Sequence, residues 1–397
     1  MRVLKFGGSS LASGQRFIEV ANIIKNKSQS SRLAIVVSAP QGVTNHLVAM
    51  AENISNEEKL KSDLLHFKHA IENIIQDLSA TLSSFCPQHC EQTLATWEHQ
   101  LSRYLHGATL LSFCPEHVRA RIISIGERLS VALLESVLAV DAIDVSVIEP
   151  EKFLRTNDVA MNAVADLVLC KERFQHNYSD LNAIALMPGF IGVDSLGNVT
   201  TLGRNGSDYS AAVLAVCSEA EYCEIWTDVD GVYNADPRLI KEAQLLDYLS
   251  YQEAMELSYF GASVLHPKTI GPIAQHHIPC LIKNTGNPEA PGTLIANEND
   301  QQKRVKAISN LDDLTMVNVS GPGMKGMVGM ASRVFATMSR ENISLILISQ
   351  SSSEYCISFC IYSADSDKAE QSLQEEFELE LLNGLLEPLS LTHELSI

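Results

Sequence analysis

The first ten residues constrain this chain most, because a short apolar segment carries a single lysine directly into a glycine-rich turn. Residues 3–10 are Val-Leu-Lys-Phe-Gly-Gly-Ser-Ser, and an amphipathic helical pattern follows over residues 11–27. Two glycines allow the backbone to approach a ligand, and the amides that open a helix attract an anion. The lysine, Lys5, precedes the glycines, so the segment is not a Walker A loop. The pattern predicts either a phosphate-binding turn with a built-in cation or an ordinary strand–turn–helix connection.

Size and charge limit the partners of the chain. Its 397 residues are enough for two or three domains. The net charge of −19 disfavours nucleic acid and anionic membranes as partners, and no apolar run approaches the length of a membrane span. Nine cysteines without a paired framework indicate reduced thiols and a cytoplasmic location. An anionic substrate must therefore be held by a local group of cations, for which Lys5, Arg204 and Arg238 are candidates.

Three segments have the composition of ligand motifs but depart from the spacing that each motif needs. The cysteines and histidines between residues 86 and 117 lack the paired C-x-x-C spacing of a zinc site. Asp228-Val-Asp-Gly lacks the glycine and glutamate positions of a calcium loop. Gly321-Pro-Gly-Met-Lys-Gly is not followed by the acidic residue that a dinucleotide site needs. The sequence therefore predicts no metal-ligating residues and no nicotinamide site.

Alternating strand and helix patterns predict a largely parallel sheet flanked by helices, which is an α/β fold. Residues 43–140 are helical almost throughout, and residues 189–202 have the pattern of a hairpin. A segment rich in Pro, Gly and Asn, residues 284–300, predicts the closing loop of the first domain. Beyond it, the order β-α-β-β-α predicts a ferredoxin-like second domain. The other expected elements are strands at 2–6, 33–37, 145–148, 183–187, 222–226 and 279–283 with helices at 207–217, 250–260 and 268–277, followed by strands at 315–320, 343–348 and 354–362 with helices at 328–340 and 367–377.

A second glycine-containing turn, residues 202–208, carries both a cation and a carboxylate. Arg204 has the bidentate fork that suits a carboxylate, and Ser207 stands where a helix N-cap is expected. Asp208, in the first helical turn, either caps that helix or belongs to a site. Gly126 lies inside another helical pattern, where a glycine costs about 1 kcal/mol of helix propensity. Its presence indicates close packing or a ligand at that point.

Taken together, these motifs resemble the aspartate kinases of the amino-acid kinase family, most closely the aspartokinase part of the bifunctional aspartokinase/homoserine dehydrogenases. The resemblance implies an amino-acid kinase fold over residues 1–290 and an ACT domain over residues 313–390. It also implies that a second ACT unit is truncated and that the dehydrogenase part is absent from these residues. The segments that carry it are Lys5-Phe-Gly-Gly-Ser-Ser, Gly42-Val-Thr-Asn-His, Ser124-Ile-Gly-Glu, Gly203-Arg-Asn-Gly-Ser-Asp-Tyr-Ser, Trp226-Thr-Asp-Val-Asp-Gly-Val-Tyr, Asp236-Pro-Arg, Ser258-Tyr-Phe-Gly-Ala, Leu265-His-Pro, Asn284-Thr-Gly-Asn-Pro-Glu-Ala-Pro-Gly-Thr and Gly321-Pro-Gly-Met.

The resemblance also implies roles for individual residues. Lys5 and Asp208 would be catalytic, with Asp208 orienting the cationic cluster. Glu127 would face the α-ammonium group of L-aspartate, and Arg204 with Ser207 would hold its carboxylate. The full set expected to bind L-aspartate is Thr44, Glu127, Phe190, Arg204 and Ser207, with Phe190 on a strand. The set expected to bind the nucleotide is Lys5, Gly7, Gly8, Ser9, Thr227, Asp228, Tyr233, Arg238, Ser263 and Val264.

The implied reaction transfers the γ-phosphoryl group of ATP, with Mg²⁺, to the side-chain carboxylate of L-aspartate. The product, 4-phospho-L-aspartate, opens the route to lysine, threonine and methionine. No general base is needed because the nucleophile is already ionised, but positive charge must stabilise the transferred group. The chain departs from the family pattern Gly-Ala-Lys-Val-Leu-His-Pro at Ser263, which cannot supply the second lysine charge. Losing one such cation costs about 10²–10³ in rate, and Lys268 is a poor substitute.

Other functions stay open from the sequence. Ser263 and the early chain end suit a catalytically weakened amino-acid-binding or regulatory module, and the fold also suits a sibling kinase for another amino acid or a nucleotide. The ACT unit implies a homo-oligomer, because its sheet edge and apolar helix face need a partner. Resemblance favours threonine over lysine as an effector, with Gln350 as the expected contact.

Overall fold

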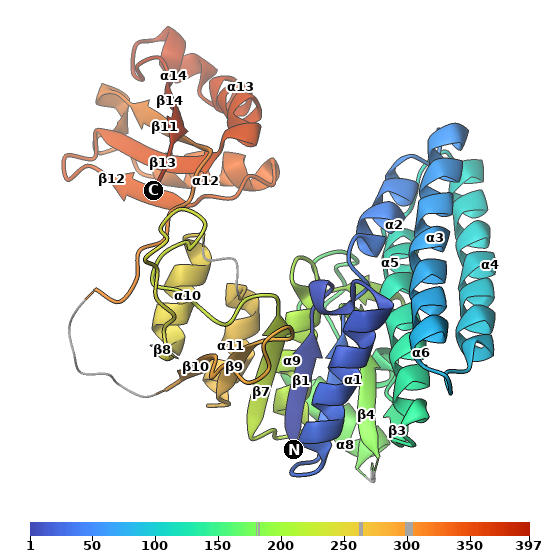
Figure 1. Ribbon diagram of the computed structural model, residues 1–397. Helices are drawn as coiled ribbons and strands as arrows, with labels where there is room; N and C mark the ends of the chain where they lie inside the picture. Colours follow the sequence, from blue (N-terminus) through green and yellow to red (C-terminus); the bar gives the residue numbers. More distant parts are fainter. Residues whose placement is uncertain (180, 182, 262–264, 298–304) are drawn as a thin grey trace. The chain divides into compact units, whose positions relative to one another are not determined.

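The computed structural model describes residues 1–397 except 180, 182, 262–264 and 298–304 (Figure 1). The chain divides into two compact units, Met1–Ile308 and Ser309–Ile397. Each unit has its own sheet and its own hydrophobic core.

An eight-stranded sheet forms the centre of the first unit, with the strand order β3-β4-β2-β1-β7-β9-β10-β8. Neighbouring strands are parallel except β9 and β10. Strand β2 is buried at all of its positions, as expected where helices cover both faces. The strands are β1 (Arg2–Phe6), β2 (Leu33–Val37), β3 (Val145–Val147), β4 (Ile184–Pro188), β7 (Tyr222–Thr227), β8 (Tyr248–Ser250), β9 (Cys280–Asn284) and β10 (Thr293–Ala296).

The six strands predicted for this unit are confirmed to within one residue at each end, and two further strands are present. Strand β10 lies inside the segment 284–300, so the prediction of a closing loop there is wrong. Strands β8 and β10 have only three and four residues, which is too short for a period-two pattern to be recognised.

Helices cover both faces of this sheet because successive residues of a strand point to opposite sides. Leu4 and Phe6 of β1 belong to one core with the first six helices, whereas Val3 belongs to the other core. The helices of the first core are α1 (Gly14–Ser28), α2 (Val43–Glu52), α3 (Glu57–Thr81), α4 (Pro87–Leu111), α5 (Glu116–Ile123) and α6 (Ile125–Val140). Those packed on the other face are α7 (Pro150–Phe153), α8 (Leu167–Tyr178), α9 (Gly206–Cys217), α10 (Tyr251–Tyr259) and α11 (Pro267–Gln275).

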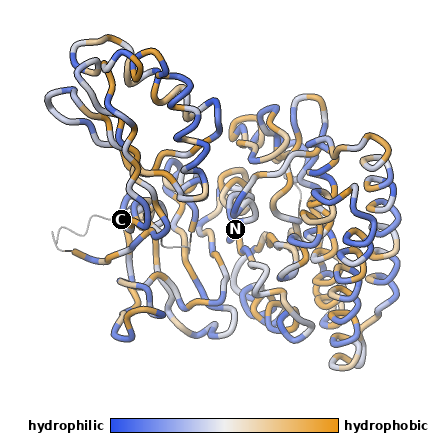
Figure 2. The backbone as a smooth tube through the Cα atoms, turned by 90° about the horizontal axis from the view of Figure 1, so that it is seen from above, coloured by the Kyte–Doolittle hydropathy of each residue, from blue (hydrophilic) through white to orange (hydrophobic). Residues whose placement is uncertain are grey.

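The helical pattern predicted over residues 43–140 is confirmed as helices α2 to α6. Figure 2 shows hydrophobic and hydrophilic segments alternating along the long helices, which is the pattern of surface helices that bury one face. The Asn56 side chain caps α3 by accepting from the Lys59 amide, and Pro87 opens α4. Gly107 lies within α4 without interrupting it. Among the described residues, no helix is both long and apolar enough to cross a membrane.

The hairpin predicted over residues 189–202 is confirmed, whereas the first helix begins later than predicted. The hairpin is confirmed as strands β5 (Ile191–Val193) and β6 (Val199–Thr201). The first helix was expected from residue 11, but a 3-10 turn, η1 (Ser9–Leu11), comes first and α1 begins at Gly14. Ser13 has an extended backbone and its side chain accepts from the Arg16 amide, so this N-cap separates the turn from the helix.

The second unit has a four-stranded antiparallel sheet with the order β12-β13-β11-β14, and its helices pack on one hydrophobic core. The ferredoxin-like prediction is confirmed, but strand β14 was missed because none of its six residues is buried and four of them are polar. Strand β12 also begins later than predicted, since the Ile343 amide bonds the Met338 carbonyl in a turn. The elements are β11 (Leu314–Ser320), η2 (Pro322–Met324), α12 (Met330–Arg340), β12 (Leu347–Gln350), β13 (Cys356–Tyr362), η3 (Ser363–Asp365), α13 (Ser366–Glu376), α14 (Glu378–Leu382) and β14 (Ser390–Leu395).

Candidate active site

The candidate site lies where the carboxyl ends of β1, β2 and β7 meet. The Ser38 amide donates to the Phe6 carbonyl at 3.1 Å, and the Gly7 amide donates to the Trp226 carbonyl at 3.1 Å. The chain leaves β1 toward β2 on one side and later returns to β7 on the other side. Such a change of direction opens a crevice beyond the strand ends, which is where ligands bind in open α/β sheets.

The glycine-rich turn after β1 is packed tightly at its base. A Cβ atom added to Gly8 would lie 3.0 Å from the Ala39 carbonyl oxygen, and one added to Gly7 would lie 3.4 Å from Lys5 Nζ. Ser10 fixes the following turn, because its hydroxyl lies 2.7 Å from that of Thr285. The space in front of the lysine ammonium is therefore kept by the missing side chain of Gly7.

Lys5 and Asp208 form a buried ion pair. Lys5 alternates with Leu4 and Phe6 along β1, so it faces helix α9, which carries Asp208 in its first turn. The lysine is 8% exposed and the aspartate 5%, and Lys5 Nζ contacts Asp208 Oδ1 directly. Each charge compensates the other in a region where either alone would be costly. The structure thus brings together two residues that are 203 positions apart in the sequence.

The glycine-containing turn over residues 202–208, which leads into α9, is capped differently from the prediction. Helix α9 begins at Gly206, and its N-cap is Asn205 with a φ of 54°, so the assignment of Ser207 as N-cap is wrong. Ser207 lies inside the first helical turn and packs on the chain at Gly189, where an added Cβ would come within 2.7 Å of Ser207 Cβ. Arg204 is half-buried in the preceding turn.

Phe190 is not on a strand, which corrects the prediction. It lies between β4 and β5 with a φ of 71°, and its amide donates to the Ser210 hydroxyl at 2.8 Å. Its carbonyl accepts from the Leu202 amide at 2.9 Å. The Phe190 ring occupies the space beside Gly206, because a Cβ added there would lie 2.6 Å from Phe190 Cδ2. Phe190 therefore supports the turn that carries Arg204.

Glu127 is a buried carboxylate, and no side-chain cation of the described residues is bonded to it. Burial raises its pKa to about 7, against the opposing effects of its own amide, the Ala39 amide, and the Arg128 and Lys5 charges. Its Oε2 has no hydrogen-bond partner among the described residues. Gly126 explains this position, since a Cβ there would lie 2.6 Å from Ala39 Cβ. The prediction of close packing at Gly126 is thus confirmed.

Thr44 lies near the same strand ends, in the first turn of α2. The N-cap of that helix is Gly42, whose φ of 84° lies in the left-handed region that glycine adopts most readily. The Val43 amide donates to the Pro40 carbonyl at 3.1 Å, which joins this turn to the segment after β2. Thr44 itself is half-buried.

The segment after β7 contains the residues expected to bind the nucleotide. Thr227 ends β7 and its hydroxyl donates to Asp228 at 3.1 Å, while Tyr233 pairs with the chain at Leu245. Arg238 stands apart, because its side chain is 85% exposed and pairs with Asp236 at 2.7 Å. That guanidinium lowers the pKa of the Asp236 carboxyl.

Sequence reasoning missed the residues that hold this segment in place. Asp230 Oδ1 accepts from Asn284 at 2.8 Å and from Asn287 at 3.2 Å, which ties the loop after β7 to the loop after β9. Thr293 accepts from the Val232 amide at 2.8 Å. The recurring Asp and Asn residues in turn segments were the available signal.

Ser263 and Val264 lie outside the described residues. Lys268 is described, and its ammonium group is fully engaged by neighbouring acceptors. It donates to the carbonyls of Ala163 at 2.7 Å and Leu202 at 2.9 Å, and to Asn162 Oδ1 at 3.1 Å. It also lies 5.1 Å from the centre of the Tyr209 ring. Lys268 therefore holds the turn that precedes α9, which agrees with the prediction that it is a poor replacement cation.

His266 is a further residue of this region that was not predicted. It caps α11, with Nδ1 accepting from the Lys268 amide at 3.1 Å. Burial lowers its pKa, and the charges of Lys268 and Arg204 lower it further. Gln350, the predicted effector contact, belongs to the second unit, where it ends the exposed edge strand β12.

A three-layer α/β fold with a glycine-rich turn and a buried lysine at the carboxyl ends of its strands defines a class of phosphate-binding proteins. Residues 1–284 match the sequence model of the amino acid kinase family, and residues 317–377 match that of an ACT domain. The chain therefore belongs to the amino acid kinase family and carries an ACT domain.

Individual relatives agree with this membership. The chain is 45% identical over 401 residues to the bifunctional aspartokinase/homoserine dehydrogenase of Haemophilus influenzae, covering 100% of this chain and 49% of the relative. The corresponding Buchnera aphidicola protein gives 45% identity with the same coverage. The structure of E. coli aspartokinase III in complex with aspartate and ADP has a TM-score of 0.85 and 28% identity, covering 100% of this chain and 86% of that one. The chain thus spans about half the length of these curated relatives.

Proposed function

We propose that the chain is an ATP-dependent aspartate kinase that converts L-aspartate and ATP to 4-phospho-L-aspartate and ADP. The observation that carries the proposal is the buried Lys5–Asp208 pair beside the glycine-rich turn, with the unpaired Glu127 carboxylate within electrostatic range of Lys5. The likeness to aspartokinase III, which was solved with aspartate and ADP, supports this choice of substrates.

The phosphoryl group is stabilised chiefly by charge in this mechanism. Lys5 Nζ and the backbone amides of Gly7, Gly8 and Ser9 hold the β- and γ-phosphates, in the space that a Cβ on Gly7 would fill. Asp208 keeps the Lys5 ammonium oriented toward that space. Mg²⁺ bound to the phosphates would neutralise the charge that develops on the transferred group.

The two charged ends of L-aspartate need separate partners. The Glu127 carboxylate pairs with the α-ammonium group, which gives its unpartnered oxygen a hydrogen-bond donor. Arg204 and Ser207 hold the α-carboxylate, and Thr44 contacts the substrate from the start of α2. Phe190 acts indirectly by supporting the turn of Arg204. The side-chain carboxylate is left as the nucleophile and attacks in line with the departing ADP.

The nucleotide extends from the glycine-rich turn toward the segment after β7. Along this path the nucleotide contacts Thr227, Asp228 and Tyr233. Arg238 reaches the nucleotide only by exchanging its contact with Asp236 for a phosphate. Such an exchange is inexpensive because exposed ion pairs contribute little.

An acyl-phosphate assay tests the proposal. With ATP, Mg²⁺ and L-aspartate, hydroxylamine should trap an aspartyl hydroxamate, and Lys5→Ala should reduce its formation by about 10²–10³. Lys25→Ala, on the surface of α1, is the matched control and should retain activity. Circular dichroism checks that both variants are folded. Equal product from wild type and Lys5→Ala would reject the proposal, and preference for glutamate, acetylglutamate or uridylate in competition would favour a sibling kinase.

A separate prediction concerns kcat and the serine at position 263. Since the second transition-state cation is missing, Ser263→Lys should raise kcat at least about tenfold, a conservative fraction of what one such cation contributes. Ser263→Met, similar in length but uncharged, is the control. An equal rate in the two variants would mean that the chain does not need a second cation here, and would count against a catalytically weakened regulatory module.

Regulation and assembly follow from the ACT domain. We infer that threonine binds near Gln350 and that ACT units of two chains pair, since β12 leaves Leu347 and Ile348 exposed at a sheet edge. A complex with lysine is known for aspartokinase III. Calorimetry with threonine and lysine on wild type and Gln350→Ala, and light scattering at micromolar concentration, test these two inferences. Nine free thiols suit a cytoplasmic location.

A further inference from the structure

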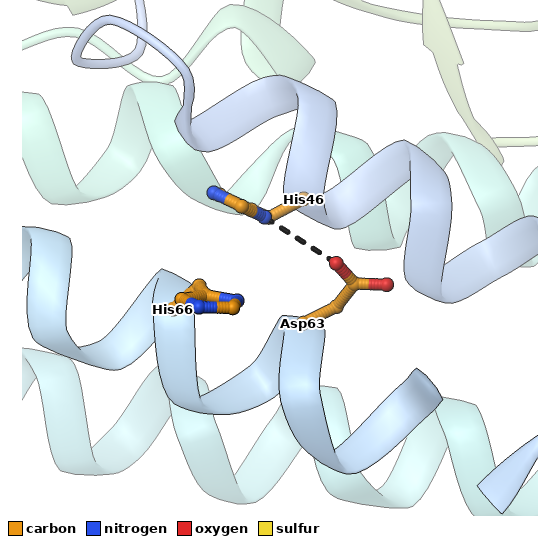
Figure 3. A group of neighbouring side chains, drawn as sticks. All are labelled: His46, Asp63 and His66. Carbon is orange, nitrogen blue, oxygen red and sulfur yellow. Dashed lines mark hydrogen bonds and ion pairs between the residues drawn. The ribbon is translucent and has the colours of Figure 1, made fainter. Parts of the chain in front are cut away.

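Two helices of the first core, α2 and α3, bring two histidines and a carboxylate together. His46 is the fourth residue of α2, and Asp63 and His66 lie three residues apart on α3, so Asp63 and His66 share one face of that helix. Figure 3 shows the three side chains meeting in the space between the helices. One potential ligand atom from each residue lies within 4.8 Å of the other two.

The contacts inside this cluster do not satisfy its polar atoms. His46 Nδ1 and Asp63 Oδ1 are 3.4 Å apart, which is long for a hydrogen bond between these groups. Asp63 Oδ2 is buried and has no hydrogen-bond partner among the described residues. Lys59, one turn before Asp63 on α3, donates to Asn53 Oδ1 at 3.1 Å instead, and Lys68 is paired with Glu72 and Glu98. The Asp63 carboxylate therefore has an oxygen available to bind a cation.

The spacing of one ligand pair, His46 and Asp63, matches the dimensions of a metal site. Metal–nitrogen and metal–oxygen bonds of about 2.1 Å give neighbouring ligand atoms about 3.4 Å apart in a tetrahedron. The His46–Asp63 separation already has this value. The His46 and His66 rings are stacked with centroids 5.5 Å apart, so His66 must rotate to turn a nitrogen toward the ion, and its exposure leaves room for this.

We propose that His46, Asp63 and His66 bind a divalent transition-metal ion of the zinc class, with water completing the coordination shell. Two imidazoles and one carboxylate select such ions over Mg²⁺, which prefers oxygen ligands. The ion links α2 to α3, and therefore fixes the start of the long α3–α4 hairpin to the helix that follows Gly42. The site needs no nucleotide and is separate from the residues proposed for phosphoryl transfer.

No metal ligand was predicted at these positions because the three residues do not follow any compact motif. His46 and Asp63 are 17 positions apart on different helices, and only the packing of α2 on α3 brings them together. The i, i+3 pair of Asp63 and His66 on one helix was the available signal, and by itself it is common on helix surfaces.

Co²⁺ titration of the whole chain, after chelator treatment and in excess Mg²⁺, tests the proposal. Wild type should bind one Co²⁺ with visible absorption typical of nitrogen and oxygen ligands, and Zn²⁺ should displace it. His46→Ala, Asp63→Asn and His66→Ala should each weaken binding at least about tenfold. His69→Ala, one turn further along α3 and outside the cluster, is the matched control and should bind normally.

A second readout does not depend on absorption. Zn²⁺ at about a hundredfold excess over its dissociation constant should raise the melting temperature of wild type and of His69→Ala by roughly 5 °C, and should leave His46→Ala unchanged. No saturable binding in excess Mg²⁺ would overturn the proposal. So would binding that persists in His46→Ala and disappears on alkylation of thiols, because the ion would then belong to cysteine.

Discussion

Two buried carboxylates in the first unit differ in what surrounds them. Glu224 in β7 is 1% exposed and Glu127 in α6 is 4% exposed. Glu224 accepts from Lys27 at 2.9 Å and from the Trp226 indole at 3.1 Å, and Arg2 lies 3.4 Å away. Glu127 has only backbone amides, and one of its oxygens has no partner among the described residues.

The contrast separates a structural charge from one suited to a ligand. Glu224 joins the sheet to α1 through a complete set of donors, so its removal would leave neighbours without a partner. Glu127 is held in an environment that disfavours its charged form and raises its pKa to about 7. A perturbed, unpaired carboxylate beside a crevice is the usual condition of a functional group. The two residues should therefore respond in opposite ways to the same substitution.

The largest expected effect is on substrate binding in Glu127→Gln. Removing the carboxylate takes away the partner proposed for the ammonium group of L-aspartate. Truncating one member of a buried charge pair costs about 2–5 kcal/mol, so the apparent KM for L-aspartate should rise by about 30-fold or more. Steady-state kinetics with saturating ATP measure this change. A KM within threefold of wild type would remove Glu127 from the site.

The pH dependence of substrate binding should follow the same carboxyl group. Below pH 7 the carboxyl is mostly protonated in the unliganded chain and cannot pair with an ammonium group. The KM for L-aspartate should thus increase by up to about tenfold per pH unit as pH falls from 7 toward 5. The Glu127→Gln variant should lose this dependence. An identical pH profile in wild type and variant would contradict the assignment.

The raised pKa of Glu127 also makes the free energy of unfolding depend on pH. Folding raises the pKa of Glu127 from 4.5 to about 7, so the folded chain binds more protons than the unfolded chain between these values. This group therefore lowers the free energy of unfolding as pH rises through that window. Glu127→Gln should be no less stable than wild type at pH 8, whereas its substrate binding is impaired.

Glu224→Gln should show the reverse behaviour. The amide keeps one acceptor for the Trp226 indole but leaves Lys27 and Arg2 without their charge partner. Because both cations are partly exposed and can be hydrated, the loss should be about 1–2 kcal/mol in the free energy of unfolding. Denaturant titration measures it. A KM for L-aspartate changed more than threefold would contradict the purely structural role of Glu224.

The fold was largely predictable because periodicity and turn residues act locally. Strand β2 is a continuous apolar run, β1 and β7 are apolar apart from single charged or polar positions, and the helical insertion has a clear amphipathic pattern. The strands that were missed, β8, β10 and β14, are short or lie at sheet edges, where side-chain burial leaves little signal. Their positions depend on pairing with distant strands.

The site was predictable in composition but not in geometry. The Gly-Gly turn and the motif around Asp208 identified two parts of the site. In both, a glycine-containing turn joins a strand to a helix and has a charged side chain beside it, and this combination is unusual enough to be recognised. The unpaired state of Glu127 was not visible in the sequence, since it depends on burial and on which donors lie nearby. The contacts of Lys268 with three backbone carbonyls also come only from the tertiary structure.

The smallest effect is expected from Gly126→Ala, which changes the surroundings of Glu127 without removing it. The new Cβ would lie 2.6 Å from Ala39 Cβ and 3.2 Å from Val43 Cγ1, so the segment after β2 must shift. The Ala39 amide then bonds Glu127 less well, and the KM for L-aspartate should rise about three- to tenfold, as expected for one weakened hydrogen bond.

Gly107→Ala in α4 distinguishes this displacement from a general effect of adding a methyl group to a helix. No atom of the described residues lies within 4 Å of a Cβ at Gly107, so this variant should gain about 0.5–1 kcal/mol of stability from helix propensity alone. At Gly126 the same gain is offset, because overpacking the core lowers the free energy of unfolding by about 1–3 kcal/mol. If both variants were stabilised equally with unchanged kinetics, the packing of Ala39 would not control Glu127. If only Gly126→Ala loses affinity, the environment of that carboxylate sets its function.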